Sequence, residues 1–522
     1  MNDPVSRLSA IARKAVQAGE WATVHACAGQ ILQQDRQSAE GHFFAGLVDK
    51  AAGRPQRAAE SFSRALAADA GRYDAAIELA YQYAVLLRHA EARALLRQYE
   101  AQLGNSPIYL DLAANVYVRL GLHACAWPLY RKANALQPGI DRFQANLAAC
   151  AVFVGEIETA TSIYKALLQK NPSHQKNHYE LSRLGTARDA SHVEQMQAIL
   201  AATGLPAEKN IFLYYAIGKE LEDLERWSEA FDYYRLAGDA VTRLANYDVG
   251  TDIDIIDKVI EVCNADWLAT GKATPRPDDA QSTPIFVVGL PRTGTTLTER
   301  IISSHSQVES AGESMFMQIA LQRVSGRADP AGMSPAIIEA AAGKAPGLVG
   351  KQYLDAVAYR LDGLPMFVEK YPENFRYLGF IARDFPAARI VHLRREPMDA
   401  CFALYKQSFF KYAYTLENLG KYYVACDRLY RHWQAVLGER LIEVKYESLV
   451  NDQEGQTRRL LDKLGLAFEP ACLAFEKNRA PSATASSVQV LEKMHNRSVG
   501  KWKKFARPLQ PLQRHLEKAG IL

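Results

Sequence analysis

Glycines that recur every 34 residues constrain this chain more than any other feature. The glycines on this grid are Gly19, Gly53, Gly121 and Gly155. Their spacings are 34, 68 and 34 residues, and Leu87 stands at the node without a glycine. A fixed period of this length marks a repeated supersecondary unit that buries its apolar face against its neighbours. The first part of the chain is therefore predicted to be a repeat array.

Two further columns keep the same period. Five residues after the nodes stand Val24, Ala58, Ala92, Ala126 and Ala160, and nine residues after them stand Phe62, Leu96, Tyr130 and Tyr164. The pattern resembles tetratricopeptide repeats, in which a small residue lies where two helices cross and a large one where they pack. The resemblance implies an all-α solenoid with regular repeats over about residues 7–174. Irregular helices and a sixth repeat are expected to about residue 241, followed by a connecting helix.

Such arrays present concave surfaces that bind peptides or partner proteins. Two other uses remain open from the sequence. The array can pack only on the rest of the chain, or it can join two copies in a homodimer.

Residues 284–297 predict a phosphate site. Ile285 to Val288 form an apolar, β-branched run typical of a buried strand, and a glycine-bounded turn and a helix follow. Free backbone N–H groups at such a helix start favour an anion. The spacing of Gly289 and Gly294 is similar to that of a Walker loop, but Thr295 stands where the lysine would be. Arg292 supplies the cation instead, so a kinase or an ATPase is disfavoured.

The sequence of this loop resembles the 5′-phosphosulfate loop of sulfotransferases, which use 3′-phosphoadenosine 5′-phosphosulfate (PAPS). It is most similar to the loop of tyrosylprotein sulfotransferases and of bacterial proteins that join tetratricopeptide repeats to a sulfotransferase domain. The resemblance implies an α/β, P-loop-type, parallel-sheet domain at 283–522, after a helical domain at 1–275. The Pro-, Gly- and Asp-rich segment 271–284 marks the junction.

The resemblance also assigns catalytic roles. A glutamate 21 residues after the loop arginine serves as general base in that family, and Arg292 plus 21 selects Glu313 over Glu309. Lys370, in a Lys-x-Pro element, would stabilise charge on the bridging oxygen. Ser486 would assist at the transferring group with Arg292, and Ser487 is the near alternative.

The nucleotide is expected to contact residues of the loop and of later elements. The loop residues are Pro291, Arg292, Thr293, Gly294, Thr295 and Thr296, and the later ones are Arg395, Tyr446, Arg497 and Lys501. Arg395 would bind the 3′-phosphate. The family's serine eight residues later is Ala403 here, so Ser408, Lys406 or a backbone group would have to substitute.

Composition narrows the classes of ligand. A net charge of +4 is too small to indicate nucleic acid. The seven cysteines show no metal-binding spacing, and no apolar run predicts a signal peptide or a membrane span. The expectation is a cytoplasmic, bacterial protein that needs no metal.

The predicted activity is transfer of a sulfuryl group from PAPS to a hydroxyl, with adenosine 3′,5′-bisphosphate as product. A peptide or protein tyrosine is the expected acceptor, while a glycan, a lipid and a small phenol remain open. The alternative is a non-catalytic scaffold of repeats with a degenerate nucleotide-binding domain, which Ala403 favours.

Overall fold

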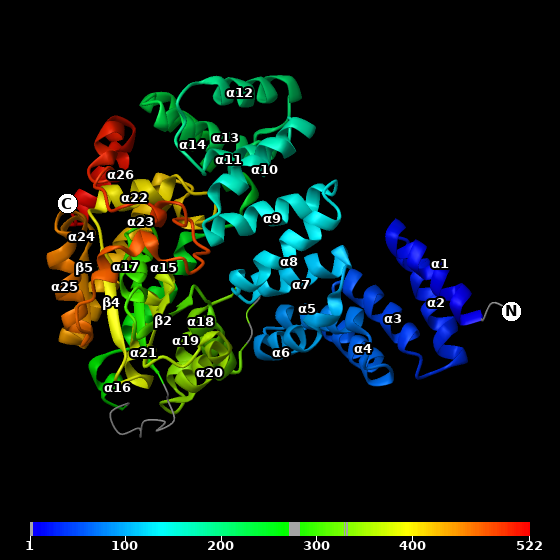
Figure 1. Cartoon of the computed structure of the whole chain (residues 1–522). Coiled ribbons are helices and arrows are strands. Elements are labelled where there is room, and N and C mark those ends of the chain that lie inside the picture. The colour runs from blue at the N-terminus through cyan, green and yellow to red at the C-terminus, as the bar shows by residue number, and fades with distance from the viewer. Residues whose placement is uncertain (1–3, 271–281, 328, 330–331) are drawn as a thin grey trace. The chain divides into compact units, whose positions relative to one another are not determined.

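The computed structural model describes residues 4–270, 282–327, 329 and 332–522 (Figure 1). By its internal contacts the chain divides into two compact units, Met1–Val154 and Gly155–Leu522. Each unit has its own core.

The first unit consists of helices connected in hairpins. They are α1 (Pro4–Ala18), α2 (Trp21–Gln34), α3 (Ala39–Ala51), α4 (Pro55–Ala68), α5 (Tyr73–Val85), α6 (His89–Tyr99), α7 (Pro107–Arg119), α8 (His123–Leu136) and α9 (Asp141–Val154). Helices α1 and α2 pack on each other, as do α3 and α4, α5 and α6, and α7 and α8. The predicted array of paired helices is confirmed.

The 34-residue grid marks the turn inside each hairpin. Gly19, Gly53 and Gly121 adopt left-handed backbone, with φ of 74°, 67° and 75°, a conformation that glycine reaches without steric cost. Leu87 adopts the same conformation at φ 59°, although it carries a Cβ. The repeat therefore imposes its turn on the node that lacks a glycine.

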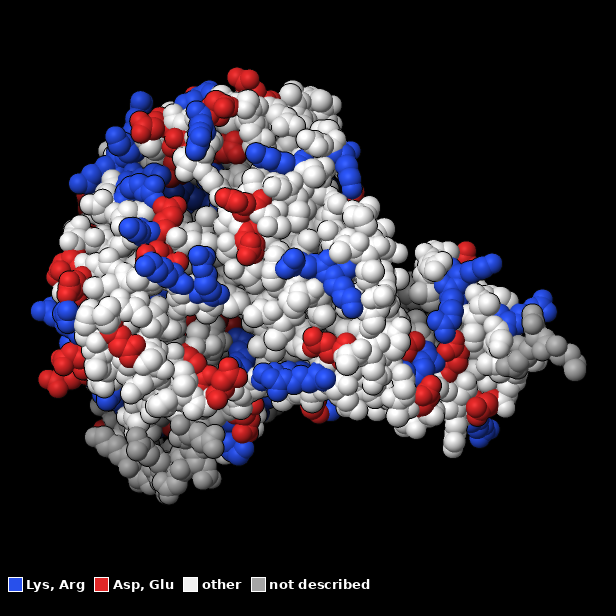
Figure 2. Space-filling model, in the orientation of Figure 1, with Lys and Arg blue, Asp and Glu red and all other residues white. Residues whose placement is uncertain are grey.

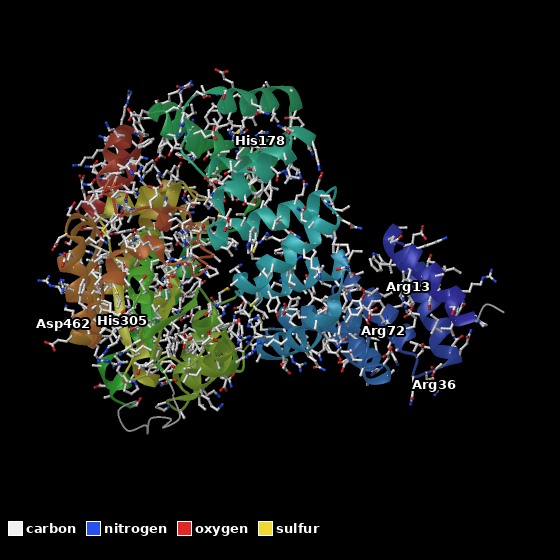
Figure 3. All side chains as sticks on the ribbon, viewed as in Figure 1. Arg13, Arg36, Arg72, His178, His305 and Asp462 are labelled. Carbon is white, nitrogen blue, oxygen red and sulfur yellow. The ribbon has the colours of Figure 1, made fainter. Side chains whose placement is uncertain are left out.

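Small residues set the helix spacing in this unit. Ala58 is fully buried, and a Cβ on Gly46 would collide with the ring of Phe62. Helices α3 and α4 can therefore approach closely only because position 46 has no side chain. At the unit's surface, Arg13 and Arg72, labelled in Figure 3, both form ion pairs with Glu40.

The second unit begins with further helices. They are α10 (Ile157–Lys170), α11 (Gln175–Ser182), α12 (Ser191–Thr203), α13 (Ile211–Asp223), α14 (Trp227–Leu244), α15 (Val249–Val262) and α16 (Ala265–Ala269). Helices α13 and α14 form the hairpin predicted as a sixth repeat. Glu225 lies at its turn with φ 59°, in the place that glycine holds in the regular repeats.

A parallel sheet organises the rest of this unit. Its strands are β1 (Thr283–Gly289), β2 (Val308–Gly312), β3 (Met366–Lys370), β4 (Arg389–Arg394) and β5 (Leu441–Lys445), in the order β2-β3-β1-β4-β5. All four strand pairs are parallel. The strand predicted at 285–288 is thus the central strand.

Helices cover both faces of the sheet (Figure 1). The helices that follow β1 in the chain are α17 (Thr295–Ser303), α18 (Phe316–Ser325), α19 (Pro335–Ala342), α20 (Leu348–Val357), α21 (Leu378–Asp384), α22 (Pro397–Tyr405), α23 (Leu416–Leu437), α24 (Tyr446–Asn451), α25 (Gln453–Leu464) and α26 (Ala506–Lys518). On one face, Ile301 of α17 and Leu461 of α25 join Val287 and Val391 in one apolar cluster. On the other, Phe286 packs against Tyr353 of α20.

The expected fold class, an all-α array followed by an α/β parallel-sheet domain, is confirmed. The predicted boundary between residues 275 and 283 stays a prediction, because residues 271–281 lie outside the described residues. No helix in the described ranges is long and apolar enough to cross a membrane. Figure 2 shows acidic and basic side chains interspersed over the visible surface of each unit.

Candidate functional site

The carboxyl ends of all five strands meet at one edge of the sheet, since every strand pair is parallel. The residues that follow or end these strands include Glu313 after β2, Lys370 at the end of β3, Arg395 after β4 and Tyr446 after β5. The glycine turn follows β1 in the middle. Ligands of open α/β sheets bind at this edge. The topology therefore collects the predicted site residues from distant parts of the chain.

The turn after β1 has an unusual backbone. Arg292 adopts left-handed φ of 68° and Gly294 has φ of 99°, directly before helix α17. Non-glycine residues in this conformation cost energy and cluster at functional sites. A Cβ on Gly294 would collide with the ring of Tyr446, so glycine is required there for packing as well.

The other loop residues are held firmly. Pro291, Thr293, Thr295 and Thr296 are buried. The hydroxyl of Thr293 donates to the carbonyl of Leu290 at 2.6 Å. No side chain in the described ranges caps the start of α17. Its first-turn N–H groups have no partner within the helix, so they can receive an anion.

Arg292 joins this loop to the segment near residue 486. Its guanidinium donates to the Ser486 hydroxyl and to Gln489 Oε1, the latter at 3.0 Å. The hydroxyl of Ser487 instead donates to the carbonyl of Thr484 at 2.8 Å. The structure thus places Ser486, and not Ser487, beside Arg292. Burial and, to a lesser extent, the neighbouring Arg395 guanidinium lower the pKa of Arg292 to about 10.

Lys370 and Glu313 form a direct ion pair at the same edge. The Lys370 side chain is 1% exposed and the Glu313 side chain is 31% exposed. Burial lowers the pKa of Lys370 to about 7, and Arg292 is near enough to contribute to that decrease. The four residues predicted as catalytic are therefore gathered in two contacting pairs.

Hydrogen bonds from the Arg360 side chain hold the backbone at Glu313 in place. Arg360 donates to the carbonyl oxygens of Ala311 and Glu313, at 2.7 and 3.0 Å. Glu309 has a different task, because its carboxylate accepts the backbone N–H groups of residues 362–364. Glu309 therefore fixes a loop and does not contact Lys370.

A second buried carboxyl group lies directly beside Lys370 in sequence. Glu369 is fully buried and accepts hydrogen bonds from Ser314, Tyr353 and Asn374. These donors are neutral, so burial raises the pKa of Glu369 to about 7. Because Ser314 follows Glu313, this contact also ties the end of β2 to β3.

Arg395 connects the loop to the C-terminal segment 498–502. It donates to the carbonyl oxygens of Arg292 and Ser498, at 3.0 and 2.6 Å. Its guanidinium lies 4.8 Å from the ring centroid of Tyr446, whose hydroxyl contacts Ser498 Oγ at 2.8 Å. The carboxylate of Asp399 accepts the backbone N–H groups of Gly500 and Trp502. The segment that contains Lys501, an expected nucleotide contact, is thus bound to the carboxyl edge of the sheet.

Two predicted phosphate ligands bind carboxylates in this structure. Lys501 forms an ion pair with Glu222 at 2.7 Å, and Arg497 forms one with Glu492. Neither side chain has a hydrogen bond to the loop. Their proposed role toward phosphate stays a prediction.

The candidates to replace the serine missing at Ala403 also have partners. The ammonium of Lys406 contacts both carboxylate oxygens of Glu222, at 2.7 and 2.9 Å. The Ser408 hydroxyl contacts Tyr179 Oη at 3.2 Å. Ala403 itself lies on α22, half-buried.

Sequence reasoning missed several residues of this site, notably Gln489, Asp399 and Glu222. Gln489 follows Ser486 by three residues, which is a spacing that could have suggested a shared face. No local sequence pattern indicates Glu222 as a site residue, because it lies in a helical repeat about 180 residues before Lys406, the lysine that it binds.

His305, labelled in Figure 3, contacts the backbone oxygen of Ala467 at 2.9 Å and is buried. Its other ring nitrogen accepts the N–H of Gln307 at 3.1 Å. These contacts connect the end of α17 to the segment after α25. Within the described part of the chain, no group of three or more His, Cys, Asp and Glu side chains is placed to hold a metal ion.

Comparison with known proteins agrees with this architecture. Residues 284–470 match the model of a sulfotransferase family. A protein-tyrosine sulfotransferase of Drosophila melanogaster is 22% identical over 238 residues, which cover 42% of this chain and 46% of that protein. An uncharacterized protein of Aquifex aeolicus (strain VF5) is 28% identical over 397 residues, covering 73% of this chain and 51% of that protein.

The chain thus spans about half the length of these two curated relatives. Among solved structures, the sulfotransferase domain from the curacin biosynthetic pathway matches 44% of this chain and 98% of that chain. That match has 16% identity and a TM-score of 0.28. The family match covers all five strands and the residues from the loop to Tyr446. The C-terminal part of this chain therefore contains a sulfotransferase-family domain.

Proposed function

We propose that this domain transfers a sulfuryl group from PAPS to a hydroxyl acceptor. The main support for the proposal is a pair of half-buried arginine side chains, each with a buried hydrogen-bond donor that is not used. The Nε–H groups of Arg292 and Arg395 are buried and have no hydrogen-bond partner among the described residues. A buried donor without a partner costs about 1–3 kcal/mol, so an anion at this edge would be strongly favoured.

The surrounding charges fit a nucleotide with two anionic groups. Arg292 and the first turn of α17 would bind the 5′ group, because both lie at the turn after β1. Arg395 follows β4, the neighbouring strand, and would bind the 3′-phosphate. The position of Tyr446 beside both Gly294 and Arg395 supports a contact between its ring and the nucleoside.

When bound, PAPS supplies an activated sulfuryl group on a good leaving group. The acceptor oxygen forms a bond to sulfur while the bond from sulfur to the bridging phosphate oxygen breaks, and the electron pair stays on the 5′-phosphate. Glu313 takes the proton of the acceptor hydroxyl. Its Oε1 contacts Lys370, which leaves Oε2 for the acceptor within the described structure.

Lys370, Arg292 and Ser486 would stabilise the charge that develops on the bridging oxygen and the sulfuryl group. The contact of Arg292 with Ser486 orients both toward one region. No step in this reaction requires a metal ion.

The acceptor that we propose is a peptide or protein tyrosine. The similarity to a protein-tyrosine sulfotransferase supports this choice. We further propose that the helical repeats hold the peptide or protein that carries the acceptor.

The test is sulfuryl transfer from labelled PAPS to tyrosine peptides and to 4-nitrophenol in the presence of a chelator. Native protein should label at least one acceptor, and Glu313→Gln should label it at least about 100-fold more slowly. A protein that binds the nucleotide but labels no hydroxyl compound would favour the scaffold function, for which Ala403 is the supporting observation.

A further inference from the structure

The predicted 3′-phosphate region has a cationic pair in place of the expected hydroxyl. Lys406 follows Ala403 by three residues at the end of α22, so the two lie on the same side of the helix. Lys501 lies in the segment that Arg395 and Asp399 bind, because the N–H groups of its neighbours Gly500 and Trp502 both reach Asp399. One ammonium group thus belongs to the end of the helix that carries Ala403, and the other belongs to the segment bound by Arg395 and Asp399.

A glutamate from a helical repeat holds both ammonium groups. Glu222 of α13 contacts the Nζ atom of Lys406 at 2.7 Å and that of Lys501 at 2.7 Å. The Tyr234 hydroxyl of α14 donates to its second oxygen at 2.8 Å. The Glu222 side chain is 5% exposed, so this carboxylate is desolvated and fully occupied.

The ion cluster keeps unused donor capacity. Each ammonium group has three N–H donors, and Glu222 receives two from Lys406 and one from Lys501. Within the described residues, three N–H groups therefore have no hydrogen-bond acceptor, and the cluster retains a net charge of about +1 from two lysines and one glutamate. A phosphate dianion has the charge and the acceptor oxygens to match them.

The hairpin that carries Glu222 is packed rigidly against the same elements. Phe231 of α14 stacks on Tyr405, with ring centroids 5.6 Å apart, and Trp227 packs on Phe505 at 5.5 Å. A Cβ on Gly238 would collide with the backbone oxygen of Tyr414. The carboxylate is therefore held in place by close contacts between α14 and the residues on both sides of the site.

We infer that Glu222, with Tyr234, positions Lys406 and Lys501 to bind the 3′-phosphate of the nucleotide, in the role left open at Ala403. The inference rests on the proposed function, because it specifies a subsite of the same nucleotide site. Glu222 is a positioning residue, and the helical repeat that carries it thereby becomes part of nucleotide recognition.

The test compares two nucleotides that differ only in the 3′-phosphate. Calorimetry gives the affinities of adenosine 3′,5′-bisphosphate and adenosine 5′-monophosphate, and their ratio isolates the 3′-phosphate. Native protein should prefer the bisphosphate. Glu222→Gln should lower this ratio about 10- to 100-fold and leave the affinity for the monophosphate unchanged. Lys406→Met and Lys501→Met should each lower it in the same direction.

Glu220→Gln is the matched control. Glu220 lies on the same helix, is buried to the same extent, and contacts His192 instead of the lysines. Its substitution should leave the ratio unchanged, and an equal decrease would show that only helix packing matters. If Glu222→Gln does not fold, the two lysine variants and Tyr234→Phe carry the test.

The outcomes separate the two proposals. Native protein that binds neither nucleotide contradicts the proposed function. Native protein that binds both nucleotides equally contradicts the inference together with the role of Arg395 toward the 3′-phosphate. A native preference for the bisphosphate with an unchanged ratio in Glu222→Gln, or in both lysine variants, contradicts the inference alone.

Discussion

Two glutamates of the second unit, Glu313 and Glu222, each form ion pairs with lysine, yet their surroundings differ. Glu222 is 5% exposed, and two lysines and a tyrosine occupy its oxygens. Those lysines overcome the effect of burial and lower its pKa to about 2. The Glu313 side chain is 31% exposed, and its carboxylate contacts only Lys370 among the described side chains.

Glu222 therefore carries a fixed charge, whereas Glu313 belongs to a pair that can exchange a proton. Glu222 has no free oxygen and cannot be protonated near neutral pH, which suits a structural anchor for cations. Glu313 is open to an acceptor, and its partner Lys370 has a pKa of about 7. A proton can therefore move to and from this pair under working conditions.

The largest effect is expected when Glu313 is substituted. Glu313→Gln should lower the transfer rate about 10²- to 10⁴-fold, because the general base is removed. Nucleotide affinity should change little, since Arg292 and Arg395 remain. Initial rates with labelled PAPS, together with calorimetry, measure both quantities, and a variant that transfers at the native rate would exclude Glu313 as the base.

The next largest effect is expected on stability when Glu222 is substituted. Glu222→Ala leaves two lysines without their buried counter-ion and should destabilise the protein by about 3–5 kcal/mol. Urea unfolding of the full chain gives this difference. Glu261→Ala is the control, because Glu261 forms an exposed pair with Lys258 and should change stability by less than about 0.5 kcal/mol. Equal effects of the two substitutions would remove the distinction.

Glu369 is buried like Glu222, but its carboxyl group accepts hydrogen bonds only from neutral side chains. Its pKa is raised from 4.5 to about 7, so the folded chain binds this proton more tightly than the unfolded chain. The resulting stability, about 3 kcal/mol, is present below pH 4.5 and is lost as the pH rises through 7.

Glu369→Gln should therefore lose about this much of the decrease in unfolding free energy between pH 4.5 and 7.5. Urea unfolding at the two pH values measures the decrease. A variant with the same pH dependence as native protein would show that Glu369 is ionised in both states.

The smallest expected effect concerns Lys370. Its pKa of about 7 means that the ammonium group is lost as the pH rises from 7 to 9, while phosphate groups are already dianions. Affinity for adenosine 3′,5′-bisphosphate should fall about tenfold over this range. Lys370→Met should bind more weakly at pH 7 and show a flat profile. A flat profile for native protein would contradict a neutral-range pKa.

Parts of the fold that depend on local pattern could be predicted from the sequence. The 34-residue period located the hairpins, and Leu87 adopts the same left-handed conformation as the glycines at the other nodes. The strand and turn before α17 were predicted as well, because glycine spacing and β-branched residues act locally. Contacts such as Arg292 with Ser486 followed only from resemblance, since no local rule relates residues 194 positions apart.

The remaining part of the site depends on tertiary packing. Glu222 lies in a helix whose apolar positions resemble those of any repeat, and nothing local shows that α13 approaches α22. Whether Lys501 faces a phosphate or a carboxylate is likewise decided by which element packs beside it. Both features require the assembled unit.

Calorimetric titration of adenosine 3′,5′-bisphosphate without magnesium tests most directly whether the carboxyl edge of the sheet binds this nucleotide. Native protein, Arg292→Ala and Arg395→Ala are compared, because these two arginines carry the unused buried donors. Native protein should bind with micromolar affinity, and each variant should bind about 10- to 100-fold more weakly or worse. No binding by native protein at millimolar nucleotide, or equal binding by all three proteins, would contradict this prediction.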